Sequence, residues 1–188
     1  MRRRLSAGTA AVGLLAGLGA VAAPGATAAE PVTLLSEDFE DGTYAPLVQN
    51  GAGTLSIVDA DGDKALLVQR RAADYVGVKT PADLLQPGGQ YTFSMKVKLA
   101  AGTAPTEARF VVEPAYTWVG NTGVTSEAWT TVTGTYTAPV SGSAATLRAF
   151  IGTKDLGATY DYLVDDIVIS GTAGTGGGTG GGTGVTTY

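Results

Sequence analysis

Apolar and polar residues alternate along much of the chain with a period of two. In residues 90–99, the apolar side chains of Tyr91, Phe93, Met95, Val97 and Leu99 alternate with polar ones. Successive side chains of a β-strand point to opposite faces, so this pattern predicts a strand with one buried face. Shorter stretches of the same kind predict further strands over 54–58, 65–69, 75–79, 109–113, 129–137, 146–151 and 160–169.

Residues that favour turns separate the predicted strands. Examples are Asp61-Gly62, Pro87-Gly88-Gly89 and Ser141-Gly142. Many short strands between such turns, with almost no helical periodicity, predict an all-β fold over residues 30–170, most simply an antiparallel β-sandwich. A closed barrel is the alternative, because the pattern of single strands does not distinguish the two architectures.

The two ends of the chain differ from this central region. Residues 1–28 combine a basic start, an apolar stretch over 10–23 and small residues at the end, which predicts a secretory signal cleaved after Ala28. The apolar stretch contains glycine and is shorter than the roughly 20 residues of a membrane-spanning helix. Residues 171–188 are mostly glycine and threonine, which predicts a flexible linker or tail. We therefore expect a secreted, extracellular protein that binds no membrane.

The composition excludes several kinds of chemistry. The 188 residues contain no cysteine and no histidine, which rules out disulfides, thiolate metal sites, cysteine nucleophiles and histidine-based triads. The formal net charge is −5, and without Arg2, Arg3 and Arg4 the remaining 9 Lys+Arg face 17 Asp+Glu, a net charge of about −8. A protein that binds nucleic acid through its phosphates has the opposite charge, so we expect no nucleic-acid partner.

Four segments carry a resemblance to a known family. They are 38–42 (DFEDG), 85–94 (LQPGGQYTFS), Trp129 with 134–137 (GTYT), and 164–167 (VDDI). Because the four segments occur in this order, the sequence over 34–170 is similar to the β-sandwich carbohydrate-binding modules of families four, nine and twenty-two. It most closely resembles the xylan-binding family twenty-two modules attached to bacterial xylanases. The resemblance implies a jelly-roll sandwich that binds polysaccharide, holds a structural calcium ion and is joined to a catalytic domain by a linker.

The resemblance also implies which aromatic residues bind the sugar. Aromatic side chains offer flat apolar faces to sugar rings at a low cost in conformational entropy. The family pattern places such residues at Tyr75 and Tyr116, and Trp118 has the same parity as Tyr116 and would widen the platform. We expect Trp129 in the core, because it opens a predicted strand of threonines with few large apolar side chains.

Three further candidates depart from the family pattern. Asn50 stands where relatives often carry arginine, and the alternation over 146–151 turns Arg148 and Phe150 outward, where xylan-binding relatives tend to carry tyrosine and glutamate. Arg148 has the chemistry to bind sugar hydroxyls or a uronic acid carboxylate, or it is an ordinary solvated arginine. These departures concern the choice of glycan rather than the fold.

For calcium, the resemblance points to Glu40 and Asp166 as ligands. Calcium prefers several carboxylate and carbonyl oxygens, and antiparallel pairing of the first and last strands would bring these two residues together. Asp165 shares parity with Ile167, so we expect it to turn inward and accept hydrogen bonds from backbone amides. The alternative is that residues 37–41 form a solvated acidic turn without a metal.

These observations predict a secreted, monomeric, non-catalytic module that binds xylan or another β-glycan. It would bring a linked glycoside hydrolase to plant cell-wall polysaccharide. One alternative is an extracellular protein-interaction or matrix domain on the same fold. Another is a small glycoside hydrolase, which would use a pair among the carboxylates at Glu107, Glu113, Glu127, Asp155 and Asp161, although none of them lies in a hydrolase-like motif.

Overall fold

The computed structural model of the protein describes residues 30–154 and 160–172. Within these residues the regular elements are strands: β1 (Val32–Glu37), β2 (Val48–Asn50), β3 (Thr54–Ala60), β4 (Asp63–Gln69), β5 (Gly77–Lys79), β6 (Gln90–Leu99), β7 (Thr106–Val112), β8 (Thr117–Val124), β9 (Thr130–Thr137), β10 (Ala149–Thr153) and β11 (Tyr162–Thr172). In this part of the chain, no helix is long and apolar enough to cross a membrane.

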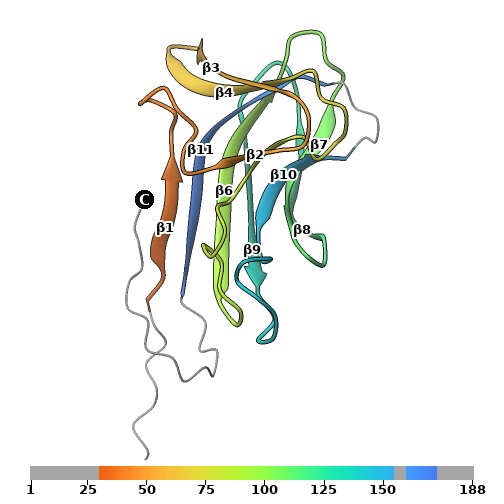
Figure 1. Cartoon of the computed structure of the whole chain (residues 1–188). Helices are drawn as coiled ribbons and strands as arrows, with labels where there is room; N and C mark the ends of the chain where they lie inside the picture. Colours follow the sequence, from red (N-terminus) through yellow and green to blue (C-terminus); the bar gives the residue numbers. More distant parts are fainter. Residues whose placement is uncertain (1–29, 155–159, 173–188) are drawn as a thin grey trace, which may run out of the picture.

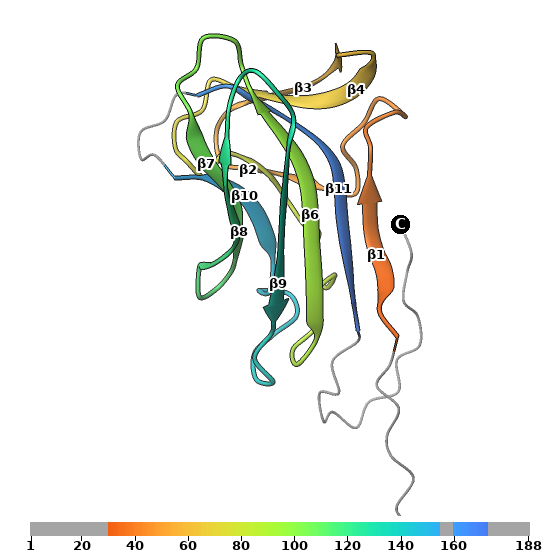
Figure 2. The ribbon, with the colours of Figure 1, turned by 180° about the vertical axis from the view of Figure 1, so that it is seen from behind.

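The strands form two antiparallel sheets that pack face to face (Figures 1 and 2). One sheet has the order β3-β4-β11-β6-β9, with β1 also paired to β11, and the other has the order β2-β5-β10-β7-β8. Along one edge, β11 pairs first with β4 and then with β1. The predicted antiparallel β-sandwich is therefore confirmed.

The core lies between the inner faces of the two sheets. On β6, the five apolar side chains of the alternating pattern are all buried, as the sequence predicts. They pack in one cluster with side chains from the opposite sheet, such as Phe110 and Ile151. The rings of Phe93 and Phe110 meet across the sandwich with centroids 5.1 Å apart.

Two glycines let the sheets approach closely at one side. Gly120 on β8 has a φ of +72°, and a Cβ atom added to Gly134 on β9 would lie only 2.6 Å from the backbone nitrogen of Gly120. A side chain at Gly134 would therefore require the two backbones to separate. This contact explains the glycine in the segment Gly134-Thr135-Tyr136-Thr137.

The structure corrects several expectations. Trp129 does not lie in the core: it is half-buried and its indole Nε1 donates to Asp61 Oδ2 at 2.9 Å. The reason is parity, since Val132 is the inward residue of β9 and Trp129 precedes it by an odd number of positions. The strand predicted over 146–151 begins only at Ala149, and the one predicted over 75–79 is reduced to β5.

The ends of the described region bear on the predicted boundaries. β11 continues to Thr172, so the sheet extends two residues into the stretch predicted as a tail. The remainder of that tail and the predicted signal over 1–28 lie outside the described residues.

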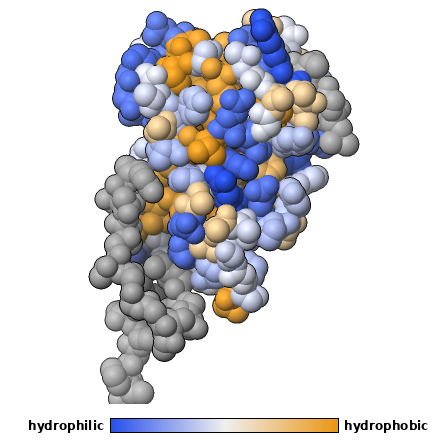
Figure 3. Space-filling view, viewed as in Figure 1, coloured by the Kyte–Doolittle hydropathy of each residue, from blue (hydrophilic) through white to orange (hydrophobic). Residues whose placement is uncertain are grey.

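On the side of the molecule seen in Figure 1, apolar and polar residues are interspersed (Figure 3).

Candidate functional site

A cavity of about 540 Å³ lies on the outer face of the five-stranded sheet. Its walls come from β2, β7, β8 and β10 and from the segments beside them: Asn50, Asp74, Tyr75, Arg109, Val111, Glu113, Tyr116, Trp118, Phe150, Gly152, Thr153 and Lys154. Five of the six predicted binding residues line it, and Arg148 is the exception. The segments involved lie far apart in the sequence and meet only in the folded sheet.

Strand alternation explains which side chains reach the cavity. On β7, Phe110 points into the core, so its neighbours Arg109 and Val111 face the other way. Val111 pairs with Phe150 on one side and with Trp118 on the other, which places three cavity residues in one row across the sheet. Phe150 thus faces the side that its parity in the sequence predicts.

Three exposed aromatic side chains surround this cavity. The exposed fractions are 48% for Tyr75, 61% for Tyr116 and 64% for Trp118. Over the described ranges, the other large apolar residues that are exposed are valines elsewhere on the surface. Aromatic side chains are normally buried for much of their area, so three exposed ones at one cavity indicate a binding surface.

Each exposed ring is supported by a neighbouring group. The Arg109 guanidinium lies 3.8 Å from the centroid of the Trp118 ring. The ring of Tyr116 meets that of Phe150 edge-on, with centroids 6.5 Å apart and planes at 70°. These contacts hold Trp118 and Tyr116 in place before any ligand arrives, which reduces the entropy lost on binding.

The third ring, that of Tyr75, rests beside Asn50 and Gly51. The Nδ2 of Asn50 donates to the carbonyl of Tyr75 at 2.9 Å. Gly51 has a φ of +74°, and a Cβ atom there would lie 3.0 Å from Cε2 of the Tyr75 ring. Glycine at position 51 therefore leaves room for the Tyr75 ring, and the hydrogen bond from Asn50 holds the backbone of Tyr75.

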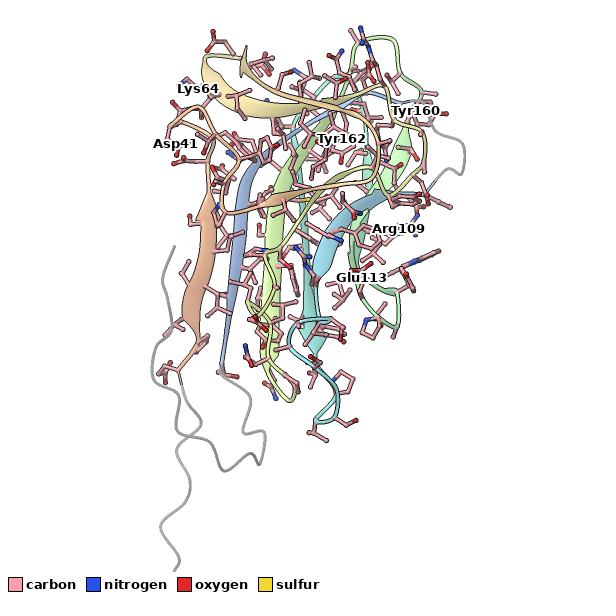
Figure 4. All side chains as sticks on the ribbon, viewed as in Figure 1. Asp41, Lys64, Arg109, Glu113, Tyr160 and Tyr162 are labelled. Atoms are coloured by element: carbon pink, nitrogen blue, oxygen red, sulfur yellow. The ribbon has the colours of Figure 1, made fainter. Side chains whose placement is uncertain are left out.

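Polar groups of both charges complete the cavity. Arg109 and Glu113 extend from β7 and from the turn that follows it, close to β8 and β10 (Figure 4). Neither was among the predicted binding residues, although alternation along the strand predicted over 109–113 places both on the same face. A mixture of carboxylate, guanidinium and aromatic groups can hydrogen-bond sugar hydroxyls while the rings contact the sugar's C–H face.

At one margin of the cavity, Lys154 is paired with a carboxylate. Its Nζ lies 3.0 Å from Oε1 of Glu107, whose other oxygen accepts a hydrogen bond from Asn121. The hydrogen bond from Asn121, with that from Lys154, lowers the pKa of Glu107 below its ordinary value. The ionised form of Glu107 is therefore favoured, and it pairs with Lys154 at this margin.

Arg148 lies outside the lining of this cavity. It precedes β10, and its Nε and Nη2 both donate to the carbonyl oxygen of Thr80, at 2.8 and 2.6 Å. The backbone amide of Glu113 in turn donates to the carbonyl of Arg148 at 2.8 Å. The guanidinium thus ties two segments of the sheet together, instead of facing the aromatic side chains.

The predicted calcium ligands are both engaged by lysines. Oε1 of Glu40 accepts from the backbone amide of Lys64 at 2.7 Å, and Oδ2 of Asp166 lies 2.5 Å from Nζ of Lys96. Over the residues that the structure describes, no group of three or more acidic side chains is placed to hold a metal ion. That Glu40 and Asp166 bind calcium therefore stays a prediction.

Asp165 turns inward as its parity predicts. Its side chain is buried, and Oδ1 accepts from the backbone amide of Asp166 at 2.6 Å. Burial raises the pKa of Asp165 above its ordinary value, more than this hydrogen bond lowers it. Pairing of β1 with β11 brings the first and last motifs to the same end of the sheet, with Glu37 opposite Ile167.

Comparison with known proteins identifies one matching family. The sequence model of a family described as carbohydrate binding domain matches residues 33–158. Endo-1,4-beta-xylanase A of Thermoanaerobacterium saccharolyticum is 30% identical over 148 residues, which cover 71% of this chain and 12% of that protein. Exoglucanase XynX of Acetivibrio thermocellus is also 30% identical over 148 residues, covering 71% of this chain and 13% of that protein. This chain therefore spans only a small part of each relative.

Solved structures share the fold. The CBM22-1 xylan-binding domain of Xyn10C from Paenibacillus barcinonensis has a TM-score of 0.66 at 24% identity, covering 79% of this chain and 100% of that one. The CBM22-1 and GH10 modules of xylanase 10B from Clostridium thermocellum, complexed with xylohexaose, have a TM-score of 0.61 at 21% identity, covering 73% of this chain and 28% of that one. These matches confirm the resemblance predicted from the four sequence segments.

Proposed function

The chain belongs to the carbohydrate binding domain family, and we propose that the cavity on its five-stranded sheet binds xylan, a β-linked polysaccharide. The observation that carries this proposal is the meeting of Tyr75, Tyr116 and Trp118, all exposed, around one cavity. Sugar rings stack on such faces, and the neighbouring carboxylate and guanidinium groups select among hydroxyl arrangements.

Xylan is favoured over other glycans by the relatives. One matching protein is a xylanase, and the structures with the same fold include xylan-binding domains. Asn50, Phe150 and Gly152 shape the cavity here. These residues set which β-glycan fits, because specificity depends on a few contacts.

The module acts by proximity to an enzyme. A chain that covers about an eighth of a xylanase can serve as its binding module, raising the local concentration of the catalytic domain on an insoluble substrate. In this role the protein works outside the cell, where plant polysaccharide is found, and the segment over 1–28 serves as its export signal. The Gly/Thr-rich segment at the other end serves as the linker.

Affinity electrophoresis tests the proposal directly. The full chain is run through native gels that contain soluble xylan, mixed-linkage β-glucan or no polysaccharide. We expect retardation in xylan, and we expect Tyr75→Ala and Tyr116→Ala together to abolish it. Val140→Ala is the matched control, because Val140 is 81% exposed but lies away from the cavity. A folded wild type that migrates equally in all gels would contradict glycan binding and would favour a protein-interaction domain.

A hydrolase is the second candidate, because two carboxylates line the same cavity. Asp74 and Glu113 both contribute to its walls, and glycosidases use a pair of carboxyl groups across the scissile bond. A reducing-sugar assay with xylan separates the two functions. We expect no release of reducing ends, and release that Glu113→Gln abolishes would establish hydrolysis.

A further inference from the structure

Arg71 is a buried charge close to the cavity that contributes nothing to its surface. The side chain is 3% exposed, and its guanidinium lies 4.8 Å from the centroid of the Tyr162 ring. Its Nη1 donates to the carbonyl of Tyr160 at 3.1 Å, and its Nη2 donates to Oγ1 of Thr153 at 3.2 Å. Burying a guanidinium is unfavourable unless its donors are paired, so the position of Arg71 depends on these acceptors.

Arg71 also binds the backbone on both sides of Tyr75. Its Nε donates to the carbonyl of Val76 at 3.1 Å, and its Nη2 donates to the carbonyl of Asp74. Asn50 Nδ2 donates to the carbonyl between them, that of Tyr75 itself. Three consecutive carbonyl oxygens, at 74, 75 and 76, are therefore each held by a side chain from another part of the molecule or from the preceding turn.

These side chains add to the limited support that the sheet gives this segment. Residues 70–76 lie between the end of β4 and the start of β5 and belong to no strand, although the backbone amide of Thr153 on β10 donates to the carbonyl of Asp74 at 3.1 Å. Tyr75 is nevertheless 48% exposed and must keep its ring in one orientation to form a platform. A loop that carries a binding residue loses less entropy on binding when other groups already fix its backbone.

We infer that Arg71 is a positioning residue that holds Tyr75 in its sugar-binding orientation. The inference rests on the proposed function, since it assigns Arg71 a role in glycan affinity through Tyr75. The planar fork of arginine reaches several acceptors at once, whereas lysine keeps the charge but offers a single nitrogen. Arg71→Lys therefore tests the fork with little change in charge or volume.

A double-mutant cycle with xylohexaose as the ligand measures the coupling. In isothermal titrations of the full chain, we expect Arg71→Lys to weaken binding by about three- to tenfold. In the Tyr75→Ala background the same substitution should change the affinity by less than about twofold, because its effect acts through Tyr75. Arg70→Lys is the matched control, since Arg70 is the adjacent exposed arginine and the substitution should leave the affinity unchanged. An equal loss in both backgrounds would overturn the inference, because a general loss of stability does not depend on Tyr75.

Hydrogen exchange supplies a readout that does not depend on glycan binding. We expect Arg71→Lys to speed amide exchange in peptides covering 70–77 while β6 and β11 keep their protection. Unchanged exchange in 70–77 would overturn the positioning role even if the wild type binds xylan. A wild type that binds no glycan, but whose 70–77 segment loosens in Arg71→Lys, would overturn the proposed function and, with it, the role of Arg71 in affinity.

A second variant covers the case in which Arg71→Lys does not fold. Thr153→Val keeps the shape of a buried residue and removes only the hydroxyl that accepts from Arg71. We expect a smaller loss of affinity with the same dependence on Tyr75. A loss that persists in the Tyr75→Ala background would contradict the inference.

Discussion

The guanidinium of Arg109 lies 3.8 Å from the centroid of the Trp118 ring, although Arg109 is 3% exposed and Trp118 is 64% exposed. A buried cation therefore lies against one face of an exposed indole. Cation–π contacts stabilise such a pair by about 0.5–2 kcal/mol, depending on how far the cation is desolvated. The contact orients the ring at the wall of the cavity, where Arg109 also lies.

This pair predicts the behaviour of Arg109 variants. Arg109→Met keeps much of the side-chain length but removes the cation, so we expect xylohexaose binding to weaken by about 2- to 30-fold. Arg109→Lys retains a cation and should lose less affinity. Isothermal titration measures both, and a Met variant that binds as tightly as the wild type would contradict a role for the contact.

The two tryptophans predict a simple optical assay. Trp118 lines the cavity, whereas Trp129 directly precedes β9 of the other sheet, and its indole donates to Asp61. We expect xylohexaose to change the tryptophan fluorescence, and we expect Trp118→Phe to abolish the change and Trp129→Phe to preserve it. If Trp129→Phe abolished the change instead, the sugar would bind the sheet that contains β9, and the prediction would be wrong.

Gly51 and Gly42 form a matched pair for testing the space beside Tyr75. Both have positive φ, +74° and +82°, but an added Cβ meets the Tyr75 ring and Val76 at Gly51 and nothing within 4 Å at Gly42. We expect each alanine variant to lose about 1–2 kcal/mol of unfolding free energy from backbone strain. Gly51→Ala alone should also weaken binding, as measured by titration beside urea unfolding. Equal affinities for the two variants would contradict this reading of the platform.

The buried Tyr162 hydroxyl predicts how stability changes in alkali. Burial raises the pKa of Tyr162 to about 12 from the ordinary value of 10.0, an effect that the nearby Arg71 only partly opposes. Its folded-state pKa lies above the unfolded one, so its contribution to stability is complete below pH 10 and is lost as the pH rises towards 12. A shift of this size corresponds to about 2–3 kcal/mol.

Urea unfolding between pH 9 and pH 12 measures this contribution. Tyr162→Phe removes the hydrogen bond to the carbonyl of Val76, so we expect it to be less stable near neutral pH by about 1 kcal/mol. Its stability should then fall less steeply than that of the wild type above pH 10. Tyr116→Phe, an exposed control, should follow the wild type throughout, and parallel curves for all three proteins would contradict the prediction.

The calcium prediction is tested by thermal unfolding in calcium and in EGTA. A calcium ion that binds the folded state but not the unfolded state raises the melting temperature by mass action. If Glu40 and Asp166 are ligands, Glu40→Gln with Asp166→Asn should abolish any rise. Asparagine suits residue 166, whose φ is 47°. An unchanged melting temperature in calcium would contradict the prediction.

Single strands could be predicted from the sequence where alternation was strong. The prediction for 90–99 matches β6 at both ends, because burial of every second side chain is a property of neighbours along the chain. β8 was missed, since Gly120 and Gly123 interrupt its pattern and its largest side chain, Trp118, faces outward. β2 is largely exposed, and the two buried residues of β1, Leu35 and Glu37, include a charged one, so neither strand carries a clear alternation.

Partners distant in the sequence explain where the predictions for single side chains went wrong. Trp129 donates a hydrogen bond to Asp61, and Arg148 donates one to the carbonyl of Thr80; the residues of each pair are 68 positions apart. Nothing in the sequence around Asp61 or Thr80 predicts that these residues accept hydrogen bonds from Trp129 and Arg148. The side-chain types were informative about chemistry, but their contacts depend on which segments the fold brings together.

The fold class and the buried face of β6 follow from the amino-acid order, because parity and residue type are local properties. The exposed aromatic residues Tyr75 and Tyr116 were instead implied by the family resemblance. The cavity does not, since it requires the register that aligns Phe150, Val111 and Trp118 across three strands. The orientation of Tyr75 likewise depends on Arg71, whose guanidinium is held by Thr153, 82 residues further along the chain. Strand register and long-range hydrogen bonds are set by packing of the whole sandwich, and through them a set of outward-facing side chains becomes a binding site.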